Sequence, residues 1–206
     1  MSLESVVLTG GQVRRGGVGE ALGIKGLALA QRIASSLAPI STRVSILGDS
    51  PLPAFPFYQD RESGKGPMAA LAEFFPKEQW VFVASCNLIG FSSDIVLDMQ
   101  KRIGGRSAVI PTVQGSPQPL CALYSRECFD TLRILVLEGE YRMESWLRRL
   151  DALEVAAASL STPAACFNVR VPTRFTNAVV NTDLRDERMR PDVKFTGWQG
   201  SDLSSV

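Results

Sequence analysis

The sequence predicts a three-layer α/β/α sandwich with a mostly parallel, Rossmann-like sheet. Short runs of β-branched and apolar residues alternate along the chain with segments of helical periodicity, which is the pattern of an α/β fold. The run over residues 80–84 is continuously apolar, as expected of a central strand buried on both faces. Glycines follow directly after the first β-rich run, where ligands usually bind in an open parallel sheet.

The first strand is expected over residues 5–9, before a glycine-rich loop that extends to Gly19. The next segment carries apolar residues at three-to-four residue spacing, which predicts a helix with one buried face. That face consists of Leu27, Ala30, Ile33, Ala34 and Leu37. A second strand is expected over residues 43–47, and residues 55–58 form a shorter candidate strand before Asp60.

A further helix is predicted to start at Gly66-Pro67, because proline is tolerated in a first helical turn. Its expected apolar face comprises Met68, Leu71, Ala72 and Phe75. Ser92 and Ser93 can cap the helix that follows the central strand. The expected buried face of that helix is Ile95, Met99 and Ile103. Further strands are expected over residues 108–110 and 120–124, and further helical segments over residues 127–137 and 143–150.

The 206 residues include no histidine and have a net charge of +1. The missing histidine excludes Ser-His-Asp and Cys-His catalysis and any histidine-ligated zinc. The balanced charge gives no indication of a nucleic-acid or anionic-membrane surface. Any chemistry must therefore use carboxylates, amides, backbone N–H groups, lysine or arginine, with a metal where one is bound.

The four cysteines, Cys86, Cys121, Cys128 and Cys166, include no C-x-x-C pair, so a structural zinc or redox motif is not expected. Cys86 and Cys121 lie in apolar runs and are interpreted as small core residues. No apolar stretch approaches the roughly 20 residues of a transmembrane helix, and we see no secretory signal. We therefore expect a cytoplasmic protein.

Composition changes near residue 176. We expect one domain over residues 1–176 and a polar C-terminal tail over residues 177–206, where residues 183–190 are dense in both charge signs. The tail is interpreted as a surface segment, or as a segment that docks on this domain or on a partner.

The glycine-rich loop is the most informative local feature. Glycines after a first strand let backbone N–H groups approach an anion closely. The loop fits neither G-x-G-x-x-G nor G-x-x-x-x-G-K-[ST], so by itself it indicates phosphate binding only weakly.

Four blocks in order make the pattern specific. Residues 8–11 read LTGG and are followed by Arg15 and Gly17, which resembles the opening L-A-G-G-x-x-x-R-x-G of the MobA-like nucleotidyltransferases. Residues 64–71, GKGPMAAL, preceded by Asp60, resemble the family's D…G-x-G-P-L-x-G-L. Residues 118–124, QPLCALY, and residues 167–172, FNVRVP, are similar to the family's third and closing blocks. The resemblance covers about residues 5–176.

The resemblance implies a fold of the nucleotide-diphospho-sugar transferase type and a transfer of GMP from GTP to molybdopterin, with release of pyrophosphate. It implies Mg²⁺ as cofactor. It assigns nucleotide binding to Leu8, Thr9, Gly10, Gly11, Gly17, Asp60, Gly66 and Pro67. It assigns catalysis to Arg15, Lys25 and Asn87, the metal position to Asn87, and the acceptor or phosphate side to Asn168 and Arg170. Pro119 and Tyr124 are interpreted as structural residues that keep a strand near the acceptor pocket.

The chain departs from the family pattern at important positions. Gly19-Glu20 occupies the slot of an Asp-Lys pair, and a carboxylate there repels phosphate. Lys25 can compensate, as can Arg14 and Arg15, or Lys25 is only a solvated residue at a helix start. Asn87 replaces the metal-binding Asp, although Mg²⁺ prefers charged oxygen. Arg170 replaces an Asn and either contacts a phosphate or is a tolerated surface residue.

The resemblance and the departures from it leave two main functional hypotheses and a third, less developed one. The first is an active nucleotidyltransferase of the molybdenum cofactor type. The second is a degenerate homologue that binds a nucleotide, a cofactor precursor or a protein partner. The third is a transferase acting on another phosphorylated acceptor, such as a sugar phosphate.

Overall fold

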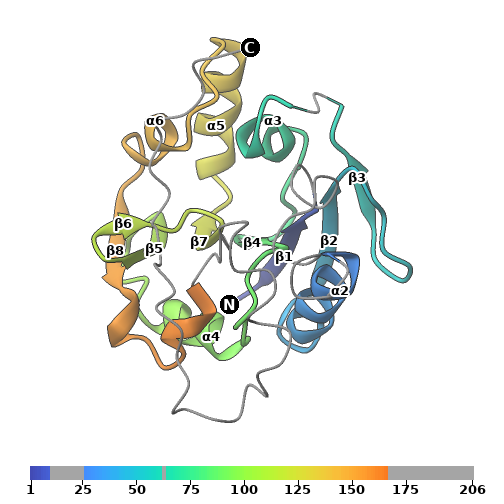
Figure 1. The fold of residues 1–206 in the computed structure, drawn as a ribbon. Coiled ribbons are helices and arrows are strands. Elements are labelled where there is room, and N and C mark those ends of the chain that lie inside the picture. The colour runs from blue at the N-terminus through green and yellow to red at the C-terminus, as the bar shows by residue number, and fades with distance from the viewer. Residues whose placement is uncertain (10–25, 62–63, 167–206) are drawn as a thin grey trace, which may run out of the picture.

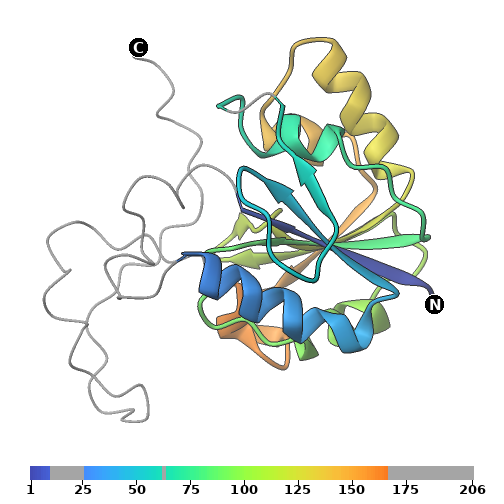
Figure 2. The ribbon, with the colours of Figure 1, turned by 90° about the vertical axis from the view of Figure 1, so that its right-hand side faces the viewer.

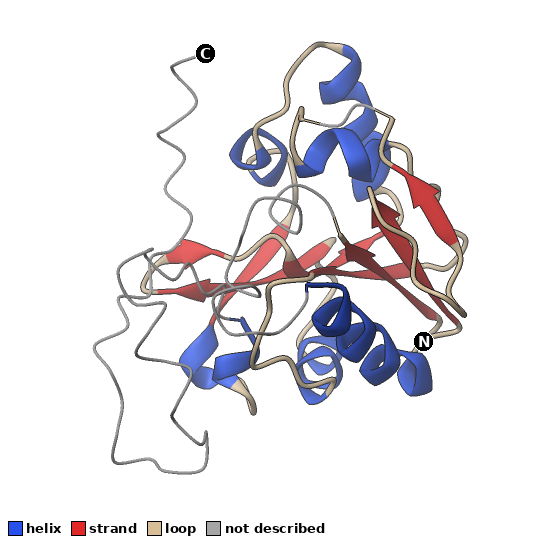
Figure 3. Ribbon diagram, turned by 45° about the vertical axis from the view of Figure 1, so that its right-hand side comes forward, coloured by secondary structure: helices blue, strands red, loops and turns tan. Residues whose placement is uncertain are grey.

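The computed structural model describes residues 1–9, 26–61 and 64–166. A single sheet lies between two layers of helices (Figures 1 and 2). One layer contains α2 (Gly26–Leu37) and α4 (Asp94–Lys101), and the other contains α3 (Pro67–Ala72), α5 (Cys128–Leu137) and α6 (Met143–Leu147). Figure 3 shows the same three layers coloured by secondary structure. The predicted α/β/α sandwich is therefore confirmed.

The sheet is mixed and largely parallel. Its strands are β1 (Leu3–Leu8), β2 (Arg43–Gly48), β3 (Phe57–Gln59), β4 (Trp80–Ser85), β5 (Ala108–Val113), β6 (Ser116–Pro117), β7 (Cys121–Ser125) and β8 (Ala152–Ala156). Their order is β3-β2-β1-β4-β7-β5-β6, with β8 paired to β5. Strand β7 runs antiparallel to both of its neighbours, whereas β3, β2, β1 and β4 are all parallel.

The register aligns the strand ends that carry the predicted motifs. Leu8, at the end of β1, pairs with Leu47 of β2 on one side and with Ser85 of β4 on the other. Because β7 is antiparallel to β4, its first residue, Cys121, lies beside Ala84 near the end of β4. Segments from four distant parts of the sequence thus meet at one edge of the sheet.

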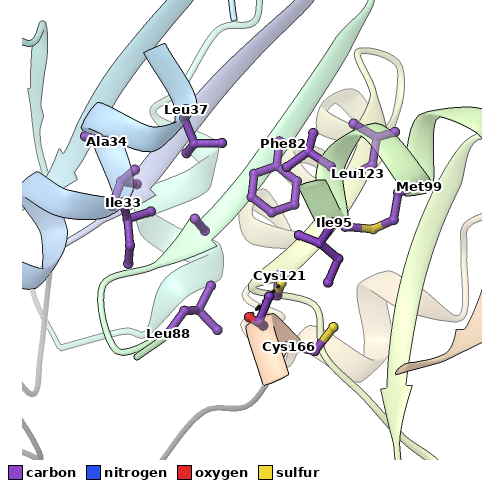
Figure 4. Packing of buried hydrophobic residues seen from close by; sticks show 14 of the residues in the cluster. Ile33, Ala34, Leu37, Phe82, Leu88, Ile95, Met99, Cys121, Leu123 and Cys166 are labelled. Atoms are coloured by element: carbon purple, nitrogen blue, oxygen red, sulfur yellow. Dashed lines mark hydrogen bonds between the residues drawn. The ribbon is translucent and has the colours of Figure 1, made fainter. Parts of the chain in front are cut away.

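Two buried clusters hold the layers together. One packs Ile33 of α2 and Ile95 of α4 against Phe82 of β4 (Figure 4). The other packs Val81 of β4 against α3, α5 and α6, with Trp146 fully buried among them. Val81 and Phe82 are adjacent in sequence and belong to opposite clusters, because successive side chains of a strand point to opposite faces. The predicted burial of this strand on both faces is therefore correct.

The predicted apolar face of α3 is wrong at one end. The helix ends at Ala72, so Phe75 is not part of it; the side chain of Phe75 is 63% exposed, and Phe74 is buried instead. The guanidinium carbon of Arg133 lies 4.2 Å from the centroid of the Phe75 ring, and Arg133 also donates a hydrogen bond to the carbonyl of Phe74. A cation over the ring compensates in part for its exposure.

Other boundaries also differ from the predictions. The face of α2 begins at Leu29 rather than at Leu27, which is 40% exposed. Helix α4 ends at Lys101, before Ile103. The hydroxyl of Ser92 accepts a 3.3 Å hydrogen bond from Asp94 N in the first turn of this helix. Helix α6 ends at Leu147 rather than at residue 150. Strands β6 and β8 were not predicted; both lie at one side of the sheet, and β8 is rich in half-buried and exposed residues.

All four cysteines are buried free thiols, which confirms the core interpretation of Cys86 and Cys121. Within the described ranges, no helix is long and apolar enough to cross a membrane. The predicted tail, residues 177–206, lies outside the described residues.

Candidate functional site

Leu8 and Thr9 form the point at which β1 leaves the sheet. The carbonyl of Leu8 accepts a 3.0 Å hydrogen bond from Cys86 N, and Thr9 N donates a 2.9 Å hydrogen bond to the carbonyl of Leu47. The buried hydroxyl of Thr9 donates to the carbonyl of Ser50 at 3.2 Å. The chain is therefore held by both neighbouring strands at the position where the glycine-rich loop begins.

The remaining residues predicted for this loop lie outside the described residues: Gly10, Gly11, Arg14, Arg15, Gly17, Gly19, Glu20 and Lys25. The same holds for Asn168 and Arg170 of the closing block.

Asp60 follows β3, which makes it the outermost of the predicted site residues along the sheet. Its backbone N–H donates a 2.9 Å hydrogen bond to the carbonyl of Gly48, and its side chain is half-buried. Since β3, β2 and β1 are parallel, Asp60 lies at the same sheet edge as Thr9, two strands away. The edge thus carries a carboxylate on the side of β3 and an amide, Asn87, on the side of β4.

Gly66 and Pro67 begin α3. Gly66 has a φ of +88°, a conformation that favours glycine, and Pro67 occupies the first helical turn. Met68 follows with a completely buried side chain. The predicted helix start is confirmed, and the Gly-Pro pair fixes the direction in which the chain enters the helix.

Asn87 lies in the loop that follows β4. Its side chain is half-buried, and its Oδ1 atom is inaccessible and has no hydrogen-bond partner within the described part of the chain. An unpaired buried carbonyl oxygen costs about 1–3 kcal/mol, so it is rarely kept without a reason. The adjacent Cys86 thiol is buried, which raises its pKa to about 11. At neutral pH this thiol is protonated, and Cys86 is therefore not an activated nucleophile.

The third motif block lies against the end of β4. Ser85 N donates a 2.8 Å hydrogen bond to the carbonyl of Leu120, and the buried Gln118 side chain donates to the carbonyl of Ser116 at 3.0 Å. The hydroxyl of Tyr124 donates to the carbonyl of Pro119 at 2.8 Å. These contacts support the structural role predicted for Pro119 and Tyr124.

The described residues do not by themselves form a site for a free divalent cation. In residues 1–9, 26–61 and 64–166, no three His, Cys, Asp or Glu side chains gather in a way that could hold a metal. Asn87 Oδ1 supplies one neutral oxygen, whereas Mg²⁺ favours several oxygens that include carboxylates or phosphates. The donor set present does not fit a resident magnesium ion held by these residues alone.

Two contacts around Asn87 were not predicted. Arg32 of α2 donates a hydrogen bond to the carbonyl of Ile89, and Gly90 packs closely on Ala164. Arg32 is exposed, as many helical arginines are. Gly90 is a single glycine between Ile89 and Phe91, with none of the neighbouring residues that usually mark a turn in a sequence. Neither residue therefore leaves a signal in local periodicity or composition.

Strand order, register and the edge that carries Thr9, Asp60 and Asn87 define an α/β fold with a mixed, largely parallel sheet. A putative nucleotide-diphospho-sugar transferase of Desulfovibrio desulfuricans has a similar fold, with a TM-score of 0.50 at 14% identity over 76% of this chain and 80% of that protein. Residues 5–154 match the family described as MobA-like NTP transferase domain, and the chain belongs to this family.

The comparisons include two curated relatives. The chain is 30% identical over 100 residues to a probable molybdenum cofactor guanylyltransferase of Halalkalibacterium halodurans, covering 46% of this chain and 50% of the relative. It is 29% identical over 124 residues to the protein of the same description from Bacillus subtilis, covering 57% of this chain and 62% of the relative. The matches thus span between half and about three fifths of the curated relatives.

A solved structure agrees in fold. Molybdopterin-guanine dinucleotide biosynthesis protein A of Archaeoglobus fulgidus superposes with a TM-score of 0.63 at 19% identity, over 82% of this chain and 93% of that protein. At this identity the similarity supports the fold and not the substrates.

Proposed function

We propose that this MobA-like nucleotidyltransferase transfers GMP from GTP to molybdopterin. The observation that carries the proposal is the junction of Leu8 and Cys86: the start of the glycine-rich loop is hydrogen-bonded to the loop that bears Asn87. The descriptions of the two curated relatives support the choice of GTP and molybdopterin.

In the proposed reaction, a terminal phosphate oxygen of the acceptor attacks the α-phosphorus of GTP. The bond between that phosphorus and the bridging oxygen breaks, and pyrophosphate leaves with the electron pair. Such a reaction depends on in-line positioning and on stabilisation of charge rather than on covalent catalysis. A chain without histidine is compatible with it.

The proposal assigns separate tasks to the two sides of the sheet edge. Backbone N–H groups after Thr9 bind the phosphates, with Arg15 and Lys25 offsetting their negative charge. Asp60, after β3, binds the nucleoside part. Asn87, which follows the end of β4, contacts the bound substrates through its half-buried amide side chain. Arg170 lies on the acceptor side in this assignment.

Nucleotidyltransferases of this family typically use a divalent metal. Because no three metal-binding side chains gather among the described residues, no step of the proposed reaction is derived through a resident ion. We expect any cation to enter with the triphosphate, which supplies charged oxygens of its own.

A degenerate, binding-only homologue is the second candidate. It is favoured by Asn87 and Glu20, which together weaken the metal position and the cationic position of the family pattern. This candidate predicts binding of GTP without turnover.

The experiment that tests the first proposal measures pyrophosphate release from GTP, with and without molybdopterin, in Mg²⁺ or Mn²⁺. Acceptor-dependent release supports nucleotidyl transfer. The melting temperature is measured in parallel, because a ligand that binds only the native state must raise it. A raised melting temperature without turnover supports the degenerate homologue. Neither response at millimolar GTP overturns the first proposal and leaves, of the second candidate, a homologue that binds a cofactor precursor or a protein partner. Release with a sugar phosphate as acceptor would redirect the assignment to the third function. Release with CTP or ATP in place of GTP would change the assigned nucleotide.

A further inference from the structure

The loop over residues 86–91, between β4 and α4, is held from two opposite sides. On one side, the guanidinium of Arg32 in α2 donates a hydrogen bond to the carbonyl of Ile89. Helix α2 is the first described element after the glycine-rich loop. The contact therefore connects the element that follows the nucleotide-binding segment with the loop that bears Asn87.

On the other side, Gly90 lies against the 3₁₀ turn Pro163–Cys166. A Cβ atom on Gly90 would lie 2.8 Å from the carbonyl oxygen of Ala164 and 3.1 Å from its carbonyl carbon. Both of those atoms belong to the backbone, so the approach cannot be relieved by rotation of a side chain. Glycine is required here by proximity and not by a left-handed conformation, because Gly90 is not among the glycines with positive φ. The turn immediately precedes the segment with Asn168 and Arg170.

The interior of the loop is also fixed. The side chain of Leu88 is completely buried in the same core cluster as Ile33 (Figure 4). The ring of Phe91 lies 5.8 Å from that of Phe82, measured between centroids. Asn87, with its unpartnered Oδ1, therefore lies in a loop that has little freedom to move while Arg32 and Gly90 are in place.

We infer that Arg32 and Gly90 are positioning residues, which hold the 86–91 loop so that Asn87 keeps its position beside the end of β1. The inference rests on the proposed function in so far as it assigns Asn87 to the substrates. Neither residue contacts the substrates in this scheme. Arg32 acts through the carbonyl of Ile89, and Gly90 acts through its close contact with the turn before the closing block.

The variants are Arg32→Gln, Arg32→Lys and Gly90→Ala. Lysine retains a cationic donor for the Ile89 carbonyl, so we expect Arg32→Lys to recover most of the wild-type behaviour. Two variants are the matched controls. Arg149→Gln removes an exposed arginine from the turn after α6, and Ser93→Ala loses no capping hydrogen bond. Thermal melts confirm that each variant is folded.

The first readout is hydrogen exchange of the loop amides, which does not depend on any ligand. Leu88 N donates a hydrogen bond to the carbonyl of Ser85 at the end of β4, and Phe91 N donates one to the carbonyl of Leu88 within the loop. We expect about tenfold faster exchange of these amides in Arg32→Gln, and faster exchange of residues 163–166 in Gly90→Ala. Wild-type exchange rates in both variants would overturn the inference whether or not the protein binds GTP.

The second readout is a double-mutant cycle on GTP affinity. Arg32→Gln is expected to weaken GTP binding about tenfold in the wild-type background and to have little effect in an Asn87→Ala background, because a positioning residue acts through the group that it positions. Equal effects in the two backgrounds would contradict the inference. If the wild-type protein binds no GTP, the proposed function fails, and hydrogen exchange alone decides the positioning role.

Discussion

The hydroxyl of Tyr124 donates a 2.8 Å hydrogen bond to the carbonyl of Pro119, five residues earlier in the chain. Tyr124 is completely buried, and its ring stacks on that of Trp146 with centroids 4.6 Å apart. The bond ties the segment that precedes β7 to the core, and this segment supplies the carbonyl of Leu120 to the end of β4. A residue deep in the sheet thereby helps to hold the segment that is hydrogen-bonded to the end of β4.

Tyr124→Phe is expected to lower the free energy of unfolding by about 1–2 kcal/mol, because the carbonyl of buried Pro119 loses its donor. Tyr141→Phe is the matched control. The Tyr141 hydroxyl bonds to Lys65 at 3.2 Å in an exposed contact, and its loss should cost less than about 0.5 kcal/mol. Urea denaturation of the two variants measures the difference. Equal losses would mean that the Tyr124 bond contributes nothing particular to the core.

Glu4 is a buried carboxylate at the opposite end of β1 from the candidate site. Its side chain is 1% exposed and accepts hydrogen bonds from Lys77 N and from Glu78 N, the latter at 3.0 Å, and it pairs with Arg43 at 3.0 Å. We expect Glu4→Leu to destabilise the protein by about 3–5 kcal/mol, since it leaves two backbone donors and a guanidinium without their acceptor. Arg43→Met should cost less, because Glu4 keeps both backbone donors.

Chemical denaturation checks this order of effects. Glu154→Leu, at an exposed position of β8, is the control and should change stability by less than about 0.5 kcal/mol. A Glu4→Leu protein as stable as this control would show that the buried carboxylate is dispensable.

Sequence patterns predicted the parts of the fold in which neighbouring residues share one environment. The strand over residues 80–84 was predicted because burial on both faces leaves no polar position, and the start of α3 because Gly66-Pro67 marks a helix entry. Phe75 was misplaced because helical periodicity does not say where a six-residue helix ends. Arg32 was missed because its partner, Ile89, lies 57 residues away and the contact involves a backbone carbonyl. Asn87 was found only through the family resemblance. The lack of a hydrogen-bond partner for its Oδ1 within the described residues is a property of the folded chain that no sequence pattern indicates.

Cys86 predicts a loss of stability at alkaline pH. Burial raises the pKa of its thiol from 9.0 to about 11, so the unfolded chain loses this proton first as the pH rises. The contribution of the Cys86 thiol to the free energy of unfolding is fully present below about pH 9. It is lost between about pH 9 and pH 11, where the unfolded state binds fewer protons than the native state.

The pH slope is measured by denaturation of wild type and of Cys86→Ala under reducing conditions. Between about pH 8 and pH 10.5, the free energy of unfolding of the wild type should fall by about 2 kcal/mol relative to that of Cys86→Ala, because each pKa unit corresponds to about 1.4 kcal/mol. Comparing the two proteins removes the contributions of Cys121, Cys128 and Tyr124. The hydrogen bond with Cys166, together with burial, raises the pKa of Cys121, and burial raises the pKa values of Cys128 and Tyr124. An unchanged difference in the free energy of unfolding between the two proteins would mean that the Cys86 thiol titrates alike in the native and the unfolded state.

Asn87→Asp tests what the neutral amide does to metal dependence. Without a divalent cation, a carboxylate at this position repels the triphosphate, and we expect weaker GTP binding than in wild type. With Mg²⁺, the carboxylate adds a charged oxygen ligand where the described residues form no cluster of three metal-binding side chains, and binding should strengthen. The ratio of GTP affinities with and without Mg²⁺ should therefore rise about tenfold, which corresponds to about 1.4 kcal/mol. Calorimetry in Mg²⁺ and in EDTA measures this ratio, with Asn87→Leu as an uncharged variant of similar size. An unchanged ratio in Asn87→Asp would mean that residue 87 does not face the metal–nucleotide complex.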